Sequence, residues 1–174
     1  CAVANTITAA EAGAFQLHTT VNGIGERAGN ASLEEVLVAL RMKGGIERYD
    51  LSHLTELSHM VEKFSGITLP RNKPVTGELA FSHESGIHIA AILEDPSSYE
   101  YFPPDMVGSE RRFILGKHTG KKALEHVVAS NGCELTDKQV CRVLDLVKDK
   151  SEHKCNITPD VLKKLIRKAK GENS

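Results

Sequence analysis

The stretch NGIGERAGN, residues 22–30, places three glycines between a short alternating segment and an amphipathic helix. Before it, residues 17–21 alternate apolar and polar side chains with a period of two, which predicts a strand. After it, apolar residues recur at helical spacing from Leu33 to Leu40. A glycine-rich loop that joins a strand to a helix is the unit of β/α proteins, which place ligand sites in such loops.

The side chains of this loop allow two interpretations. Glu26 and Asn30 can offer oxygens to a divalent cation, and Arg27 can pair with a carboxylate. The alternative is a tight turn in which the charges of Glu26 and Arg27 are solvated. The loop is not a dinucleotide fingerprint, because the G-x-G-x-x-G spacing is absent.

The residues around the loop predict helices on both sides of it. An alanine-rich segment, residues 2–14, predicts a helix ended by Gly13. Ser32 and Glu35 predict a capping box for the following helix, which the pair Gly44 and Gly45 would end. The chain opens on Cys1 rather than Met, with no capping residue before the first helix, so we expect it to be a truncated part of a longer parent.

The remainder of the chain predicts mostly helices. The expected elements are a helix over 51–64, an extended connector over 69–78, a helix over about 84–93, a proline-framed loop over 95–104, a short strand over 113–115, and helices over 121–129, 137–149 and 159–170. Thr136 with Gln139 predicts a capping box, and Thr158 with Pro159 predicts a cap followed by proline at the first helical position. The fold class is therefore mainly α with short strands.

Composition excludes several classes of protein. The chain has 174 residues, 40% hydrophobic and 26% charged, which is typical of globular domains, and a net charge of -1 gives no basic surplus for nucleic acid or lipid. No apolar run approaches the ~20 residues that span a membrane. The four cysteines, 1, 133, 141 and 155, are far apart, so we expect a cytoplasmic protein with neither a signal peptide nor disulfides.

Three segments together carry a family resemblance. Residues 22–30 resemble the signature of the isopropylmalate, homocitrate and citramalate synthases, and residues 77–88 and 115–120 resemble two further family segments in the same order. The resemblance implies the last β/α portion of a TIM (β/α)₈ barrel followed by helical lid or linker subdomains. We expect the barrel portion over 1–45, a lid/linker subdomain over 46–132 and a helical C-terminal subdomain over 133–174.

The resemblance also implies an activity. Enzymes of this family condense acetyl-CoA, the co-substrate, with a 2-oxoacid held by a divalent metal such as Mg²⁺, Mn²⁺ or Zn²⁺, and they act as homodimers. A base removes a proton from the acetyl methyl group, the enolate attacks the ketone, and thioester hydrolysis releases coenzyme A. Isopropylmalate and homocitrate synthesis are the leading reactions, and citramalate and citrate formation stay open.

Position by position, the resemblance assigns residues of the loop. Asn30 matches the asparagine in or beside the metal shell, and Glu26 matches a glutamate that organises it. Thr20, just before the loop, is assigned to substrate binding. The family's paired metal-binding histidines would precede Cys1, so the metal ligands are incomplete here and we expect the fragment alone to be inactive.

Further residues are assigned to the lid. His88 and Tyr101 match a histidine and a tyrosine that lie over the active site, where the histidine assists proton transfer, which suits its near-neutral pKa. The alternative for His88 is a helix histidine satisfied by Glu84, one turn away. His83 is assigned to substrate binding, with orientation of the lid as its expected role.

Two questions stay open at this point. Lys117 and His118 either meet a phosphate or anchor the helix that follows them. The whole chain, in turn, is either the enzyme portion described above or a non-catalytic helical interaction or regulatory module that retains the family's shape.

Overall fold

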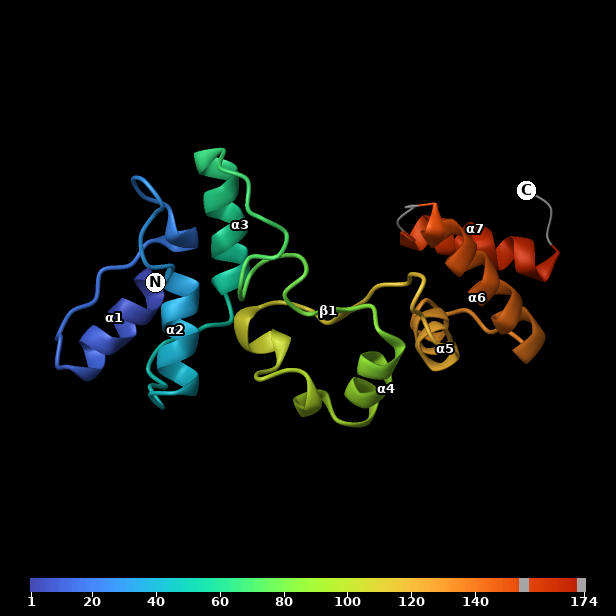
Figure 1. The fold of residues 1–174 in the computed structure, drawn as a ribbon, viewed down its shortest axis with the longest axis horizontal. Coiled ribbons are helices and arrows are strands. Elements are labelled where there is room, and N and C mark those ends of the chain that lie inside the picture. Colours follow the sequence, from blue (N-terminus) through green and yellow to red (C-terminus); the bar gives the residue numbers. More distant parts are fainter. Residues whose placement is uncertain (154–156, 172–174) are drawn as a thin grey trace. The chain divides into compact units, whose positions relative to one another are not determined.

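The computed structural model describes residues 1–153 and 157–171 and is mainly helical (Figure 1). Cys155 lies outside the described residues, and Cys1, Cys133 and Cys141 are free thiols. No helix in the described part of the chain is long and apolar enough to cross a membrane. The predicted fold class, mainly α with short strands, is confirmed.

The chain divides into two compact units, each built from two stretches of sequence. Unit 1 comprises residues 1–81 and 102–111, and unit 2 comprises residues 82–101 and the described residues from 112 onward. The expected boundaries at residues 45 and 132 stay a prediction.

Unit 1 contains three α-helices and two single-turn helices among its described residues. They are α1 (Ala2–Glu11), η1 (Val21–Gly23), α2 (Leu33–Met42), α3 (Leu54–Ser65) and η3 (Pro104–Val107). Helix α1 buries none of its residues but contacts α2, which its small side chains permit. The core is formed by Val38, Leu51, Leu54, Phe81 and Val107. Phe102 packs edge-on against Phe81, with ring centroids 5.5 Å apart, so the returning segment 102–111 completes this core.

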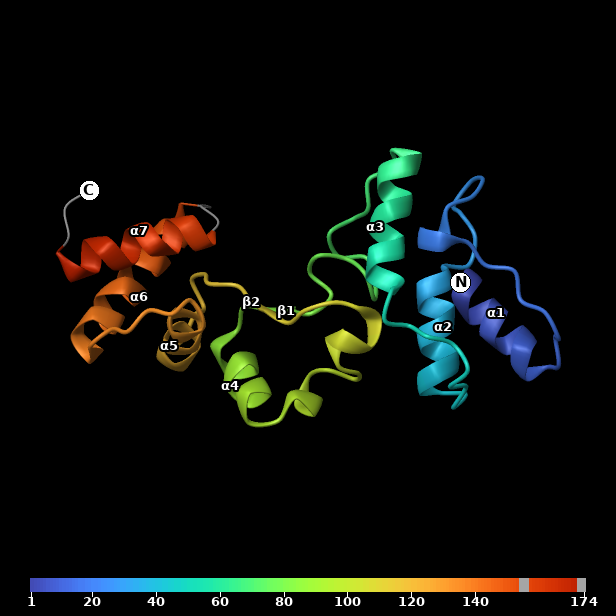
Figure 2. The same cartoon turned by 180° about the vertical axis from the view of Figure 1, so that it is seen from behind.

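Unit 2 combines a two-stranded parallel sheet with four α-helices among its described residues. The elements are β1 (Ser82–His83), α4 (Gly86–Glu94), η2 (Pro96–Ser98), β2 (Arg112–Phe113), α5 (Lys121–Ser130), α6 (Asp137–Glu152) and α7 (Pro159–Lys170). Strands β1 and β2 run side by side, with His83 opposite Phe113 (Figure 2). Helices α5, α6 and α7 pack around a core that includes Leu124, Val143 and Ile166.

The helix ends of unit 2 confirm the local signals in the sequence. Thr136 and Gln139 form the capping box of α6, with the Thr136 amide donating to Gln139 Oε1 at 2.9 Å. The hydroxyl of Thr158 accepts from the Val161 amide at 3.3 Å, and Pro159 occupies the first turn of α7. Both caps depend on residues within three positions of each other, which makes them readable from sequence.

Two local predictions are wrong. Residues 17–19 form no strand; only Thr20 makes a single bridge, to Ser32, and a 3-10 turn follows at Val21–Gly23. A strand needs a neighbour for its backbone groups, and the described residues supply none along 17–19. The Ser32 and Glu35 capping box does not form either, because Ser32 donates to Glu34 and Glu35 pairs with Lys73.

Candidate functional site

The loop between Thr20 and Ser32 is closed by its own backbone. The Thr20 amide donates to Ala31 O at 3.0 Å, and the Leu33 amide donates back to Thr20 O at 2.9 Å. Inside this ring, the Asn30 amide donates to Gly23 O at 2.9 Å. The loop therefore leaves and returns at nearly one point, directly before α2.

Two glycines permit this tight path. At Gly29 a Cβ atom would lie 2.2 Å from Gly23 O, and the backbone has a φ of +91°, so only glycine is tolerated there. At Gly25 a Cβ would lie 2.5 Å from Asn30 Nδ2. The carboxamide of Asn30 thus lies directly over Gly25, and its Nδ2 donates to Ile24 O at 3.3 Å. The amide oxygen is thereby given a defined orientation.

A buried carboxylate joins the two ends of the loop. Glu34, at 0% exposure, accepts from the Asn22 amide with Oε1 at 2.8 Å and from the Ser32 hydroxyl with Oε2 at 2.6 Å. Asn22 has a φ of 61°, a left-handed conformation that asparagine tolerates better than most residues. Glu34 therefore holds both ends of the loop with one side chain.

The same network reaches α3 and the connector after it. Asn22 Nδ2 donates to Ser58 O at 2.9 Å, and Ser58 Oγ donates to Asn22 Oδ1 at 2.5 Å. Ser58, fully buried, also lies 3.0 Å from the hydroxyl of Thr76, itself 2% exposed. Polar groups so deep in a protein require partners, and here each is satisfied by another element.

Lys73 supplies the positive charge of this network. Its Nζ donates to Ser32 Oγ at 3.2 Å and lies 3.1 Å from Glu35 Oε1, with only 10% of its side chain exposed. Ser32 Oγ thus accepts from the ammonium group and donates to Glu34. The hydroxyl links the buried carboxylate to the buried cation.

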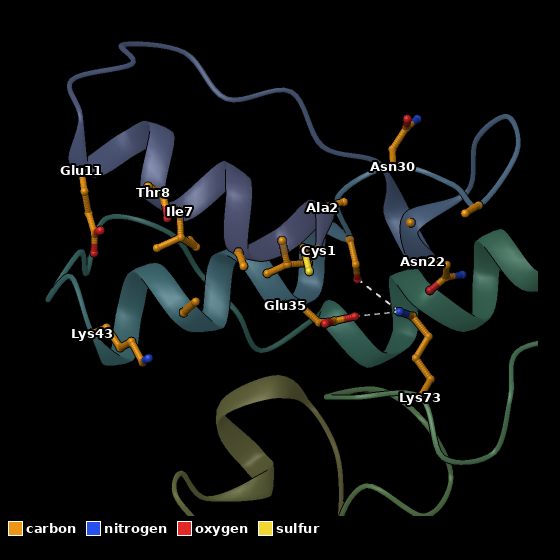
Figure 3. Close-up of a pocket in the computed structure, with 16 residues that line it drawn as sticks. Cys1, Ala2, Ile7, Thr8, Glu11, Asn22, Asn30, Glu35, Lys43 and Lys73 are labelled. Atoms are coloured by element: carbon orange, nitrogen blue, oxygen red, sulfur yellow. Dashed lines mark hydrogen bonds and ion pairs between the residues drawn. The ribbon is translucent and has the colours of Figure 1, made fainter.

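A cavity of about 810 Å³ opens beside the network within unit 1. It is lined by α1, the 22–32 loop, α2 and Lys73, and Asn30 is among its lining residues (Figure 3). In Figure 3 the carboxamide of Asn30 points away from the Glu35–Lys73 pair. Asn30, Glu35 and Lys73 therefore line the same cavity, although the Asn30 carboxamide does not face the ion pair.

Glu26 and Thr20 lie differently from Asn30. Glu26 is solvated and pairs with Arg27 at 3.1 Å, with side-chain exposures of 88% and 86%, as the solvated interpretation of these charges requires. The hydroxyl of Thr20 is buried and has no hydrogen-bond partner among the described residues. The predicted roles of Glu26, Thr20 and Asn30 stay predictions.

The described residues do not fit a divalent metal by themselves. No group of three or more His, Cys, Asp or Glu side chains within 1–153 and 157–171 is arranged to hold one. Asn30 can contribute a single oxygen, and a metal site needs several ligands.

The second set of predicted residues lies in unit 2. The ring of His88 stacks on Tyr99, with centroids 4.2 Å apart, whereas Tyr101 is 71% exposed. The carboxylate of Glu84, expected as an alternative partner of His88, lies against Gly116, where a Cβ would be 2.2 Å from Glu84 Oε1. His88 is therefore an exposed histidine supported by an aromatic ring.

His83 is held in the interior of unit 2. Its Nε2 lies 3.3 Å from Glu100 Oε1, and the two side chains are 13% and 3% exposed. The ring also faces Phe113 across the two strands, with centroids 6.4 Å apart. The ring of His83 is therefore held in place by Glu100 and Phe113. Its predicted roles in orienting the lid and binding the substrate stay predictions.

The segment Gly116 to Gly120 forms a tight turn in front of α5. The Gly116 amide donates to Thr119 Oγ1 at 2.7 Å, and Thr119 is 2% exposed. A Cβ at Gly86 would lie 3.0 Å from the Gly120 amide nitrogen, so the first turns of α4 and α5 meet backbone to backbone. The turn anchors α5, while Lys117 and His118 are exposed.

Sequence reasoning found one half of the polar site in unit 1 and missed the other. Asn30 and Thr20 were singled out, but Glu34, Ser58 and Lys73 were not. One signal was present: Glu34 stands four residues before Val38, on the face of α2 that proves buried. Asn22 lies 12 positions from Glu34, and Lys73 lies 41 positions from Ser32, the residue that it bonds, so no local pattern reveals these contacts.

Comparisons with known proteins identify the family to which the chain belongs. Residues 1–61 match the family model described as HMGL-like, and residues 75–155 match homocitrate synthase post-HMGL domain-like. The chain is 58% identical to homocitrate synthase AksA of Methanosarcina mazei over 172 residues, 98% of this chain and 42% of that protein.

Two further relatives carry different names. A probable 2-isopropylmalate synthase of Ignicoccus hospitalis is 46% identical over 96% of this chain and 42% of its own length. A putative (R)-citramalate synthase CimA of Methanopyrus kandleri is 46% identical over 98% of this chain and 34% of its own length. The chain spans less than half the length of these relatives. It belongs to the isopropylmalate/homocitrate synthase family, and its two matches, HMGL-like and then post-HMGL, are in line with a C-terminal portion of such an enzyme.

Proposed function

We propose that this chain is part of an acyltransferase of the homocitrate synthase type, which condenses acetyl-CoA with 2-oxoglutarate. The observation that carries the proposal is the 22–32 loop, whose internal bonds orient the carboxamide of Asn30, one of the residues that line the unit 1 cavity. Homocitrate is placed before isopropylmalate because the relative that is 58% identical is named a homocitrate synthase, while the isopropylmalate relative is 46% identical.

Residues of both units are proposed to act in this reaction. Asn30 would contribute one oxygen to a divalent metal whose other ligands lie outside this chain. Thr20, whose buried hydroxyl has no partner within the described part of the chain, would bind the substrate, and Glu26 would organise the metal shell. His88 and Tyr101 would serve proton transfer, since both are exposed in unit 2 and accessible to a substrate.

The wider architecture is also part of the proposal. We assign residues 1–45 to the last β/α portion of a TIM barrel, 46–132 to a lid/linker subdomain, and 133–174 to a helical subdomain. The active enzyme would be a cytoplasmic homodimer. The chain alone would be inactive, because a barrel does not close from one β/α unit and residues 1–153 and 157–171 hold no group of three metal-binding side chains.

The test is a chimera in which this chain replaces the matching 172-residue segment of the Methanosarcina mazei enzyme. Coenzyme A thiol release is measured with acetyl-CoA, Mg²⁺ or Mn²⁺, and 2-oxoglutarate, 2-oxoisovalerate, pyruvate or oxaloacetate in turn. We expect release with 2-oxoglutarate, and loss of it in the His88→Ala chimera.

The isolated chain, assayed under the same conditions, is the negative control. Turnover by it would contradict the proposed inactivity. A folded chimera that releases no coenzyme A with any of the four oxoacids, although the unmodified relative does, would favour a non-catalytic helical module instead.

A further inference from the structure

We infer that Glu34 is a positioning residue that holds the 22–32 loop, and with it Asn30, in the geometry described above. The inference deepens the proposed function, on which its catalytic arm rests. Glu34 does not line the cavity, so it acts through the loop and not by touching a substrate. Its carboxylate is the point at which the two ends of the loop meet.

The geometry leaves Glu34 little freedom. One carboxylate oxygen accepts from the Asn22 amide and the other from the Ser32 hydroxyl, at 2.8 Å and 2.6 Å. A fully buried carboxylate is tolerated only when it is hydrogen-bonded and its charge is compensated. Lys73 compensates it through Ser32, so cation, hydroxyl and carboxylate form one chain. A change at Glu34 therefore reaches both ends of the loop.

The loop conformation depends on this clamp because two of its residues are held in a left-handed backbone. Asn22 and Arg27 have φ angles of 61° and 56°. Such conformations cost free energy and persist when the surrounding bonds enforce them. The hydrogen bond from the Asn22 amide to Glu34 fixes the backbone at the beginning of the loop. Gly23 is the next residue, so its bond with the Asn30 amide depends on that conformation.

Glu35 provides a matched control. It is the next residue on α2, carries the same charge, and pairs with Lys73, but it bonds neither end of the loop. Gln at position 34 keeps the shape of the side chain but turns one acceptor into a donor. The new amide group would face Ser32, so the Ser32 hydroxyl proton would lose its acceptor. The Ser32 oxygen would still accept from Lys73.

The first arm of the experiment is amide hydrogen exchange, followed by NMR, on the chain itself. We expect Glu34→Gln to speed exchange of the Asn22 and Asn30 amides at least tenfold, while the amides within α2 keep their rates. Glu35→Gln should leave both loop amides within about twofold of the unmodified chain. Equal loop exchange in the two variants would overturn the inference.

A second variant keeps the test informative if Glu34→Gln does not fold. Ser32→Ala removes one hydroxyl, cuts the link between Lys73 and Glu34, and leaves the Asn22 bond in place. It should speed exchange of the same two amides by at least threefold, and unchanged rates would count against the clamp.

The second arm measures kcat and KM in the chimera described above. Glu34→Gln should lower kcat at least tenfold and change the KM for acetyl-CoA by less than about twofold, because the loop is disturbed and the lid residues are not. An unchanged kcat would overturn the positioning role. An unmodified chimera without activity would instead count against the proposed function, and the exchange comparison would stand independently.

Discussion

The imidazole of His88 lies over the ring of Tyr99, with centroids 4.2 Å apart and planes inclined by 34°. Tyr99 and Tyr101 are separated by one residue in the proline-framed loop. Tyr99 supports the histidine, while Tyr101 is 71% exposed. Tyr99 therefore supports the histidine ring, and Tyr101 is the exposed tyrosine to which the proposed role in proton transfer is assigned.

Removing one hydroxyl from each tyrosine tests this division. In the chimera, Tyr101→Phe should lower coenzyme A release by about 10²-fold, the usual scale for losing a proton-transfer group. Tyr99→Phe keeps its aromatic ring under His88 and should retain kcat within about twofold. Equal losses in the two variants would contradict the division, and steady-state kinetics at saturating 2-oxoglutarate measures it.

Gly25→Ala tests whether the orientation of Asn30 matters for activity. The added Cβ would lie 2.5 Å from Asn30 Nδ2, which displaces the carboxamide but no backbone. We expect a loss of at least tenfold in kcat of the chimera with a change of under about 0.5 kcal/mol in unfolding free energy, since the displaced side chain is exposed. Gly120→Ala, whose Cβ would meet only Gly86 Cα at 3.8 Å, is the control and should leave kcat unchanged.

Lys73→Met should destabilise unit 1 far more than Glu35→Gln. Removing the buried ammonium leaves Glu34 without compensation, and breaking a buried ion network from one side costs about 3–5 kcal/mol. Glu35 is 26% exposed and can be solvated, so its neutralisation should cost about 1 kcal/mol or less. Urea denaturation measures both, and a smaller loss for Lys73→Met than for Glu35→Gln would refute the compensation argument.

The carboxylate of Glu62 should make the segment after α3 sensitive to acid. The hydrogen bond from the Leu69 amide, at 2.7 Å, lowers the pKa of Glu62 below its usual value, and His59 adds to the shift. A carboxyl with a lowered pKa stabilises the fold above its usual pKa and loses this contribution as pH falls through the folded value.

The amide proton of Leu69 reports this titration by NMR. Its chemical shift should change with a midpoint below the usual glutamate pKa, and Glu62→Gln should abolish the change. A midpoint at or above the usual value would show that the bond is not maintained in solution.

The His83 side chain should contribute to the stability of unit 2. It is 13% exposed and bonds Glu100, so His83→Ala removes a hydrogen bond from a carboxylate that is 3% exposed. The expected cost is about 1–3 kcal/mol, measured by thermal unfolding. His53→Ala, at an exposed histidine that pairs with exposed Glu56, is the control and should cost less than about 0.5 kcal/mol.

Features that depend on residues close together in the sequence could be predicted, whereas features that depend on distant residues could not. The capping box of Thr136 and Gln139 formed as predicted because both partners lie within one turn. The strand over 17–21 did not form, because its pattern says nothing about whether a neighbour is present to pair with. The expected capping box of Ser32 and Glu35 did not form, because both side chains bond Lys73, which lies 41 residues from Ser32.

The candidate site shows the same limit. Asn30 was recognised from the family signature, yet the reason for its orientation lies in Gly25 beneath it and in the bond to Ile24 O. The Glu34 network was not predicted, because a glutamate within an amphipathic helix is ordinarily solvent-exposed. The residues that compensate its burial, Asn22, Ser32 and, through Ser32, Lys73, span 51 positions of the chain, which a single sequence window does not reveal.

The interleaving of the two units has a consequence for synthesis on the ribosome. Unit 1 needs Val107 and Phe102 for its core, but residues 82–101, which belong to unit 2, are translated before them. Neither α2 nor α3 can finish burying its apolar face until residue 111 has left the exit tunnel. By then residues 82–101 have also emerged, without the remainder of unit 2. A chain shortened to residues 1–81 would emerge with its core permanently open, so a nascent-chain arrest series should show protection of α3 beginning only after residue 111 is released.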